Sequence, residues 1–224
     1  MHAAPKIFGI GLSRTGTTSL SLALELLGFR AIHFPSDPVT RMEIVSQLDR
    51  GNERLSLSIL EHADALTDTP VCCTYQALDR AYPGSKFILT VRDEEAWVRS
   101  CVAYWTAGRA RPVRRQARRL KLNARHVAAR LSRHDSALPF PLYVERINRA
   151  IFGVPRPTAE RFRHARQAYE AAALEHFSAR AEDLLVIDIC AGEGWDILCP
   201  FLGVAVPDVP FPAANRLVHH SQPA

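Results

Sequence analysis

The stretch that decides the fold covers residues 6–20 and reads K-I-F-G-I-G-L-S-R-T-G-T-T-S-L. Gly11 and Gly16 give it the G-x-x-x-x-G frame of a P-loop, whose backbone N–H groups surround a phosphate ahead of a helix. A nucleoside triphosphatase has Lys and then Ser or Thr after the second glycine, whereas Thr17 and Thr18 follow here. The frame therefore predicts an anion site without the lysine that contacts terminal phosphates.

The flanking residues favour a strand before this loop and a helix after it. Residues 6–10 are short, apolar and β-branched, as in a buried parallel strand. Beyond the loop, apolar side chains recur at helical spacing: Leu20, Ala23, Leu24 and Leu27. Gly28 stands where a left-handed residue often ends a helix. An ordinary βα turn is the alternative, but a helix N-terminus beside several hydroxyls favours phosphate binding.

The composition indicates a folded, soluble protein of one α/β domain. The chain has 224 residues, of which 47% are hydrophobic and 23% charged. No apolar run approaches the roughly 18 residues of a spanning helix. Arg14 and Glu25 interrupt the first apolar stretch, so a secretory signal is not expected. The five cysteines form no C-x-x-C pair, which favours reduced thiols and a cytoplasmic location.

Basic residues are concentrated in one segment. Between Ala96 and His134 there are eleven Lys or Arg residues and no Asp or Glu. We interpret residues 108–157 as a helical insertion or lid, with arginines along one face: Arg111, Arg114, Arg115, Arg118 and Arg119. A solvated helix, a lid over an acidic acceptor and a membrane-surface helix are the alternatives.

Apolar stretches and helical stretches alternate, which predicts a parallel sheet covered by helices on both faces. Strands are expected at 7–10, 30–33, 65–67, 87–91 and 184–189. Helices are expected at 52–62, 71–82, 94–107, 158–181 and 194–202, followed by an irregular tail over 204–224. Thr69 and Pro70 are suited to start the helix over 71–82. Ligands collect at the carboxyl ends of such strands, so the loop, His33, Asp68 and Arg92 should converge.

A second phosphate site is predicted at the end of the fourth strand. The sequence K-F-I-L-T-V-R ends in Arg92, and Ser100 follows eight residues later on a helix. An arginine fork and a hydroxyl together can hold a phosphate. An ion pair of Arg92 with Asp93 or Glu94 is the alternative.

The two sites together resemble the sulfotransferases that use 3′-phosphoadenosine 5′-phosphosulfate. The resemblance rests on G-x-x-R-T-G-T-T-S-L and on the eight-residue spacing from Arg92 to Ser100. It spans nearly the whole chain. L-L-V-I-D from Leu184, G-W-D-I-L-C-P-F-L-G from Gly194 and P-D-V-P-F-P from Pro207 resemble a bacterial and fungal branch of the family. The resemblance implies a single P-loop-like α/β domain.

It also implies roles for individual residues. In that family the loop holds the 5′-phosphosulfate, and the strand Arg and helix Ser hold the 3′-phosphate. The implied donor-binding residues are Ser13, Arg14, Thr15, Gly16, Thr17, Thr18, Arg92 and Ser100. Because the donor has no γ-phosphate, neither the missing lysine nor a metal is expected to be required. Arg14 replaces the lysine that contacts the donor's bridging oxygen in cytosolic members, and should stabilise the leaving phosphate.

Two features of the cytosolic members are missing. Their C-terminal Arg-Lys-Gly sequence, which completes the 3′-phosphate site, has no counterpart, and the arginine-rich segment is a candidate substitute. The position of their catalytic histidine holds Asp68. We therefore predict Asp68 as the general base, with His33 at the end of the second strand as the alternative.

The predicted function is sulfuryl transfer from 3′-phosphoadenosine 5′-phosphosulfate to a hydroxyl or amine of a small-molecule, glycan or lipid acceptor, with no nucleic-acid partner. A small-molecule kinase is the rival enzyme, disfavoured by the missing lysine. A non-catalytic module that binds nucleic acid or anionic lipid through the basic segment is the other rival. Among the aromatic residues near Ser100, we expect Trp97, Tyr104 and Trp105 in the core.

Overall fold

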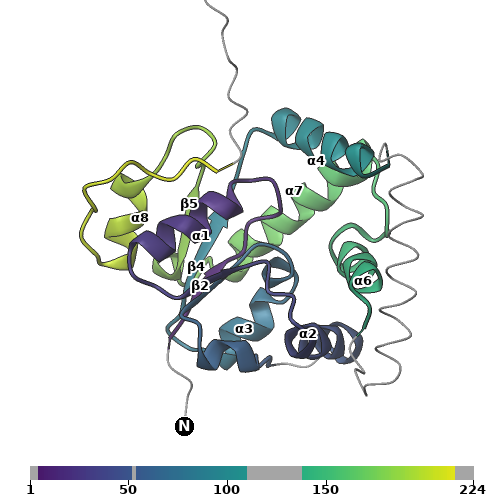
Figure 1. Ribbon diagram of the computed structural model, residues 1–224, viewed down its shortest axis with the longest axis horizontal. Coiled ribbons are helices and arrows are strands. Elements are labelled where there is room, and N and C mark those ends of the chain that lie inside the picture. The colour runs from purple at the N-terminus through teal and green to yellow at the C-terminus, as the bar shows by residue number, and fades with distance from the viewer. Residues whose placement is uncertain (1–4, 52–53, 110–137, 215–224) are drawn as a thin grey trace, which may run out of the picture.

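Five short parallel strands form one sheet in the computed structural model of the protein, which describes residues 5–51, 54–109 and 138–214 (Figure 1). The strands are β1 (Ile7–Gly9), β2 (Ala31–His33), β3 (Ala65–Thr67), β4 (Lys86–Thr90) and β5 (Leu184–Ile187). Their order is β2-β3-β1-β4-β5. In register, Gly9 pairs with Thr67 on one side and with Ile88 on the other. The carboxyl ends of all five strands therefore lie at one edge, with the end of β1 at its centre.

One face of the sheet is covered by α1 (Thr17–Leu26) and α8 (Trp195–Leu202), as Figure 1 shows. The core on this face joins strand and helix side chains: Ile7, Ile88, Ile187, Leu20, Leu24 and Leu198. These apolar contacts hold α1 against the sheet, because removing apolar surface from water stabilises the packing. The first turn of α1 is thereby fixed beside the end of β1.

The opposite face is covered by a larger set of helices. They are α2 (Pro38–Arg50), η1 (Ser58–Glu61), η2 (Val71–Cys73), α3 (Tyr75–Ala81), α6 (Phe140–Phe152) and α7 (Ala159–His176). The short turn η3 (Ala181–Asp183) leads into β5. Phe87 on β4 is central to this core, with its ring 5.2 Å from that of Phe8 and 4.7 Å from that of Phe177. Tyr143 and Ile147 on α6 reach the same core, so α6 is packed on the domain.

Helix α4 (Glu94–Arg109) lies beyond the carboxyl ends of the strands and packs on α7. A third apolar cluster joins them to the loop: Leu12, Cys72, Trp97, Val98, Cys101 and Phe162. On the surface, Arg163 of α7 pairs with Glu95 of α4 at 2.9 Å. This packing places the inner face of α4 over the loop after β1.

The expected doubly covered parallel sheet is confirmed, but several helices differ from the prediction. The helix predicted over 52–62 is wrong, since residues 54–62, the described part of that stretch, form only the short turn η1. Helix α2, which we did not predict, is capped at its N-terminus by Asp37, whose side chain accepts a hydrogen bond from the Thr40 N–H at 3.0 Å. Its buried face is mostly polar, with Thr40, Arg41 and Gln47 beside Ile44. Apolar periodicity therefore could not reveal it.

The predicted start of the helix over 71–82 is also wrong. That stretch is the 3₁₀ turn η2 followed by α3, and no described side chain caps either of them. The Thr69 hydroxyl instead approaches Oδ1 of Asp68 at 3.4 Å. The predicted helix over 158–181 is shorter in the structure and ends at His176.

The predicted insertion over 108–157 is described only in part. Residues 140–152 are helical, as expected, whereas the five arginines between 111 and 119 lie outside the described residues, so the lid stays a prediction. Residues 204–214 contain neither helix nor strand, and the ring of Phe211 packs 4.7 Å from that of Trp195. Within the described ranges, no helix is long and apolar enough to cross a membrane.

Candidate active site

The two loop glycines are required by close approach and by backbone conformation. A Cβ on Gly11 would lie 1.8 Å from Oγ1 of Thr90 and 2.7 Å from its carbonyl oxygen, so a larger residue would displace β4. Gly16 has φ of 101° and immediately precedes α1. None of the described side chains caps this helix, and its first turn contains no acidic residue. Its N–H groups are therefore available to an anion.

Thr15 holds the loop in place through hydrogen bonds within the protein. Its side chain is buried, its hydroxyl donates to the Leu12 carbonyl at 2.6 Å, and Oγ1 of Thr90 lies at the same distance. Its backbone N–H also points to the Leu12 carbonyl. Of the three predicted donor-binding threonines, Thr17 and Thr18 line a large cavity at this edge of the sheet, whereas Thr15 does not. The structure thus separates Thr15 from the residues that can face a ligand.

Arg14, Arg92 and Ser100 form one group, which we call the arginine–serine cluster. Nε of Arg14 donates to Oγ of Ser100 at 3.0 Å, and Nη1 of Arg92 donates to the Arg14 carbonyl at 3.2 Å. The alternative ion pair of Arg92 with Asp93 or Glu94 is absent from the described contacts. Asp93 accepts a hydrogen bond from the Ala96 N–H at 2.8 Å, and Glu94 accepts one from the Gln167 amide at 3.0 Å. The loop and the strand arginine, predicted as two sites, are therefore in direct contact.

Two residues for which the sequence predicted no role in the site hold this cluster in place. Nη2 of Arg166, on α7, donates to the Arg92 carbonyl at 2.5 Å, and its guanidinium lies 5.4 Å from the centre of the Trp97 ring. Nε1 of Trp97 donates to the Ser13 carbonyl at 3.0 Å. The supporting role of Trp97 could have been predicted, because it lies three residues before Ser100 and therefore on the same face of the helix. No local signal links Arg166 to Arg92.

The prediction of three core aromatic residues on α4 holds for Trp97 and is wrong for Tyr104. Trp97 is fully buried, whereas Tyr104 is 61% exposed. The Tyr104 ring lies 5.4 Å from the Arg14 guanidinium, a cation–π distance. Tyr104 therefore belongs to the wall beside Arg14.

His33 and Asp68, predicted as alternative bases, lie side by side. Nε2 of His33 is 3.4 Å from Oδ2 of Asp68 and 3.2 Å from Oγ1 of Thr18. The other ring nitrogen, Nδ1, is 3.1 Å from Oγ1 of Thr67. The parallel register explains this arrangement, because His33 at the end of β2 faces Thr67 and Asp68 comes next. His33 thus connects the carboxylate to the phosphate loop.

The two members of this pair differ in burial. The Asp68 side chain is 7% exposed and that of His33 is 30% exposed. Burial raises the pKa of Asp68, while the charge of His33 and hydrogen bonds from Thr69 and Ser13 oppose the rise. The carboxylate is therefore a stronger base than a solvated one, and the imidazole is the member more open to a ligand.

Backbone strain is concentrated around the same groups. The described residues with positive φ that are not glycine are Arg14 at 79°, Phe34 at 51° and Asp68 at 71°. Each lies in the segment after β1, β2 or β3, and all three line one cavity. Such conformations are sparsely populated and gather at functional sites. This clustering favours the cavity as the site of function.

The cavity, which we call the cleft, has a volume of about 1500 Å³. Its lining includes the loop, His33, Asp68, Arg92 and Ser100, so the expected convergence at one sheet edge is confirmed. The volume exceeds the roughly 300–1,000 Å³ of a single small-molecule site, which leaves space for two ligands. No group of three or more His, Cys, Asp or Glu side chains within the described ranges is placed to hold a metal ion.

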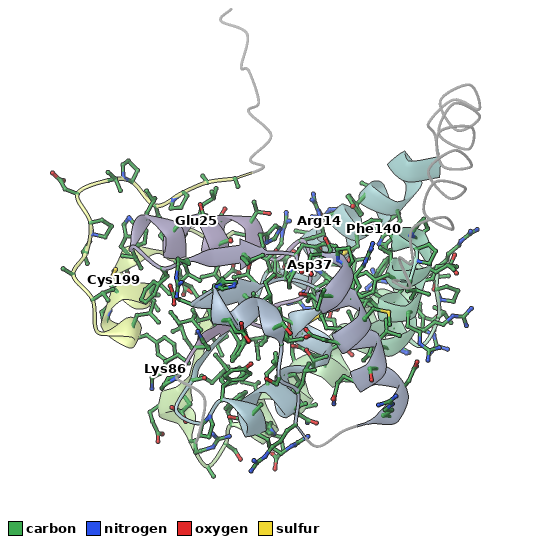
Figure 2. All side chains as sticks on the ribbon, turned by 60° about the horizontal axis from the view of Figure 1, so that its bottom comes forward. Arg14, Glu25, Asp37, Lys86, Phe140 and Cys199 are labelled. Carbon is green, nitrogen blue, oxygen red and sulfur yellow. The ribbon has the colours of Figure 1, made fainter. Side chains whose placement is uncertain are left out.

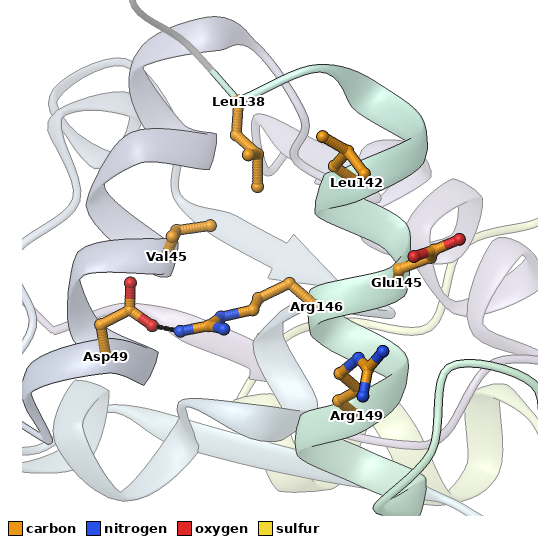
Figure 3. Close-up of a pocket in the computed structure, with 7 residues that line it drawn as sticks. All are labelled: Val45, Asp49, Leu138, Leu142, Glu145, Arg146 and Arg149. Carbon is orange, nitrogen blue, oxygen red and sulfur yellow. Dashed lines mark ion pairs between the residues drawn. The ribbon is translucent and has the colours of Figure 1, made fainter.

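A second hollow of about 330 Å³ lies between α2 and α6 (Figure 3). Its lining consists of Val45, Asp49, Leu138, Leu142, Glu145, Arg146 and Arg149, and Asp49 pairs with Arg146 across it. None of the predicted site residues is among these described lining residues. The cleft is therefore the candidate active site.

Comparison with known proteins identifies the class to which this loop and cleft belong. A family model described as a sulfotransferase domain matches residues 6–219, so the chain belongs to the sulfotransferase family. The "Ava biosynthesis cluster protein M" of Aspergillus versicolor is 25% identical over 228 residues, covering 92% of this chain and 79% of that protein. The recognised resemblance is confirmed at the level of the family, which supports sulfuryl transfer in general.

A solved structure agrees with the fold. The crystal structure of a sulfotransferase from Alicyclobacillus acidocaldarius matches with a TM-score of 0.52 and 17% identity, covering 93% of this chain and 84% of that one. The predicted α/β architecture with a central parallel sheet is thereby confirmed.

Proposed function

We propose that the protein transfers a sulfuryl group from 3′-phosphoadenosine 5′-phosphosulfate to a small-molecule acceptor. The observation that carries this proposal is the arginine–serine cluster beside a helix start that no described side chain caps. Together they provide two anion-binding places in one cleft, as a nucleotide with phosphates on both the 3′ and 5′ oxygens requires.

The residues present fit such a donor. The N–H groups at the start of α1 and the hydroxyls of Thr17 and Thr18 would hold the 5′ end. Arg92 and Ser100 would hold the 3′-phosphate. Because Nε of Arg14 bonds to Ser100, we assign Arg14 to the 3′-phosphate side. It would supply the positive charge that the C-terminal Arg-Lys-Gly sequence supplies in cytosolic members.

The His33–Asp68 pair would receive the acceptor's proton. The donor would supply the sulfuryl group, and the acceptor oxygen would form the new S–O bond as the S–O bond to phosphate breaks. The more exposed imidazole of His33 would meet the acceptor hydroxyl, and the adjacent Asp68 carboxylate would stabilise the imidazolium. Thr18, bonded to His33, would keep this pair in line with the loop. The base is thus the pair and not Asp68 alone.

Calorimetric titration with adenosine 3′,5′-bisphosphate, ADP and ATP tests the donor. The bisphosphate is the product that remains after transfer, and it should bind more tightly than ADP or ATP. Tighter binding of ATP, or a requirement for magnesium, would favour a kinase instead.

We also propose a cytoplasmic location. Cys72, Cys101 and Cys199 are buried thiols that form no disulfide. Unpaired thiols persist in a reducing compartment. Fractionation of cells that express the tagged chain would test this.

A further inference from the structure

We infer that the acceptor is a neutral, largely apolar hydroxy compound, bound between Phe34 and helix α6. This inference rests on the proposed function, because it assigns the part of the cleft that the nucleotide would leave free. It also chooses among the small-molecule, glycan and lipid acceptors that the sequence left open.

The wall of the cleft changes character beyond His33. Helix α6 contributes four apolar side chains to the lining, and their spacing places them along one side of the helix: Phe140, Val144, Ile147 and Ile151. Phe34, which directly follows His33, and Phe152 complete this wall. An apolar surface thus begins one residue from the proton-accepting pair.

Among the described lining residues of this wall, Phe34 and those of α6, none carries a charge. The one amide there, Asn148, donates its nitrogen to the Pro155 carbonyl at 3.2 Å. A sugar bound here would leave several hydroxyls without partners, at a cost of about 1–3 kcal/mol for each buried group. A charged group seated against this wall, away from Asp68 and the arginine–serine cluster, would lose its hydration with no opposite charge beside it.

The aromatic rings on this wall are placed to meet a ligand. The rings of Phe34 and Phe140 are 6.1 Å apart at an interplanar angle of 62°, and Phe140 is still 45% exposed. Figure 2 shows Phe140 and Arg14 on the same side of the domain, and both line the cleft. An apolar ring or chain laid on Phe140 would cover this exposed surface, which favours binding. Its hydroxyl could then reach His33.

The experiment uses calorimetry on the full chain saturated with adenosine 3′,5′-bisphosphate. The probes are 2-naphthol, 1-decanol and methyl glucoside. We expect 2-naphthol or 1-decanol to bind and methyl glucoside not to bind. Their relative affinities distinguish a ring-shaped acceptor from an alkyl chain.

Two matched variants on α6 localise the binding. Phe140→Ala removes a ring from the cleft and should weaken binding of the apolar probe about five- to tenfold. Leu142→Ala removes an apolar side chain that is 51% exposed and points into the hollow between α2 and α6 (Figure 3), so it should change nothing. Both variants alter exposed positions, and unchanged bisphosphate affinity will show that they are folded.

Two outcomes would overturn the inference. Methyl glucoside could bind at least as tightly as the apolar probes, or the two variants could behave alike. A native protein that binds 2-naphthol but not the bisphosphate would overturn the proposed function instead, since the apolar wall would then serve another reaction.

Discussion

Nε of Arg14 lies 3.0 Å from Oγ of Ser100, so the phosphate loop is bonded directly to helix α4. Arg92 adds a second link through its hydrogen bond to the Arg14 carbonyl. A phosphate that binds Ser100 or Arg92 therefore also meets the loop arginine. Under the proposed function, the 3′-phosphate is therefore the part of the nucleotide whose binding should depend most on the cluster.

Arg92→Ala should abolish the preference for adenosine 3′,5′-bisphosphate over AMP. Loss of one charge-assisted contact costs about 1.5–3 kcal/mol, or roughly ten- to hundredfold in affinity. Calorimetry with both nucleotides measures this difference. Arg99→Ala, on the exposed side of α4, removes the same charge outside the cleft and should leave the preference intact. Equal binding of the two nucleotides by the native protein would rule out a 3′-phosphate site.

Arg14→Met should weaken binding of the bisphosphate roughly tenfold and binding of AMP much less, because the Arg14 side chain is directed to Ser100. Arg14→Lys keeps the charge, but its single ammonium cannot reproduce the guanidinium fork, so its affinity should lie in between. Isothermal titration of both variants with both nucleotides gives the comparison. Equal losses for AMP and the bisphosphate would instead place Arg14 at the 5′ end.

The residues at the carboxyl edge of the sheet could be predicted from the sequence, because short local patterns identify them. The loop glycines, the strand ending before Arg92 and the position of Asp68 each follow from a few adjacent residues. The arrangement of these groups relative to one another depends on contacts that span the chain. Arg166 supports Arg92 across 74 residues, and His33 meets Asp68 only because β2 lies beside β3.

Thr15 shows a different limit of the sequence. A run of hydroxyls after a strand predicts phosphate contacts, yet Thr15 is directed to Leu12 and Thr90. Which hydroxyl faces the ligand depends on the left-handed turn at Arg14, which nothing in the residue types announces. The apolar wall on α6 was similarly hidden, because it becomes recognisable only when Phe34 lies opposite it.

Asp68→Asn should stabilise the protein near neutral pH. Burial raises the pKa of Asp68 above its ordinary value of 3.8, so folding favours the protonated form. The stability linked to this group is fully present below that value and is lost as pH rises through the raised pKa. Asn cannot ionise and tolerates positive φ. The melting temperature of the Asp68→Asn variant should exceed that of the native protein at neutral pH. This difference in melting temperature should become smaller at acid pH.

Asp64→Asn is a control for which we expect the opposite change in stability. The bonds from Arg30 lower the pKa of Asp64, so its contribution is present above the ordinary value and is lost as pH falls. This variant should therefore be destabilised at neutral pH. Melting curves at neutral and acid pH test both substitutions, and a destabilised Asp68→Asn would show that the carboxylate is satisfied in its buried site.

His33→Gln and Asp68→Asn should each lower turnover by about 10²–10⁴-fold, the usual contribution of a general base. The two side chains are 3.4 Å apart. If they share one proton-accepting task, as proposed, the double variant should be about as slow as the slower single variant. Affinity for adenosine 3′,5′-bisphosphate should hardly change. Transfer from a radiolabelled donor to 2-naphthol measures turnover, and calorimetry measures the affinity.

His164→Gln, at an exposed position on α7, makes the same substitution outside the cleft and should retain full turnover. Normal turnover in Asp68→Asn beside an inactive His33→Gln would show that the imidazole acts without the carboxylate. The reverse result would make Asp68 the sole base, as the sequence first indicated. A multiplicative loss in the double variant would contradict a shared task, because independent groups add their free energies whereas members of one unit do not.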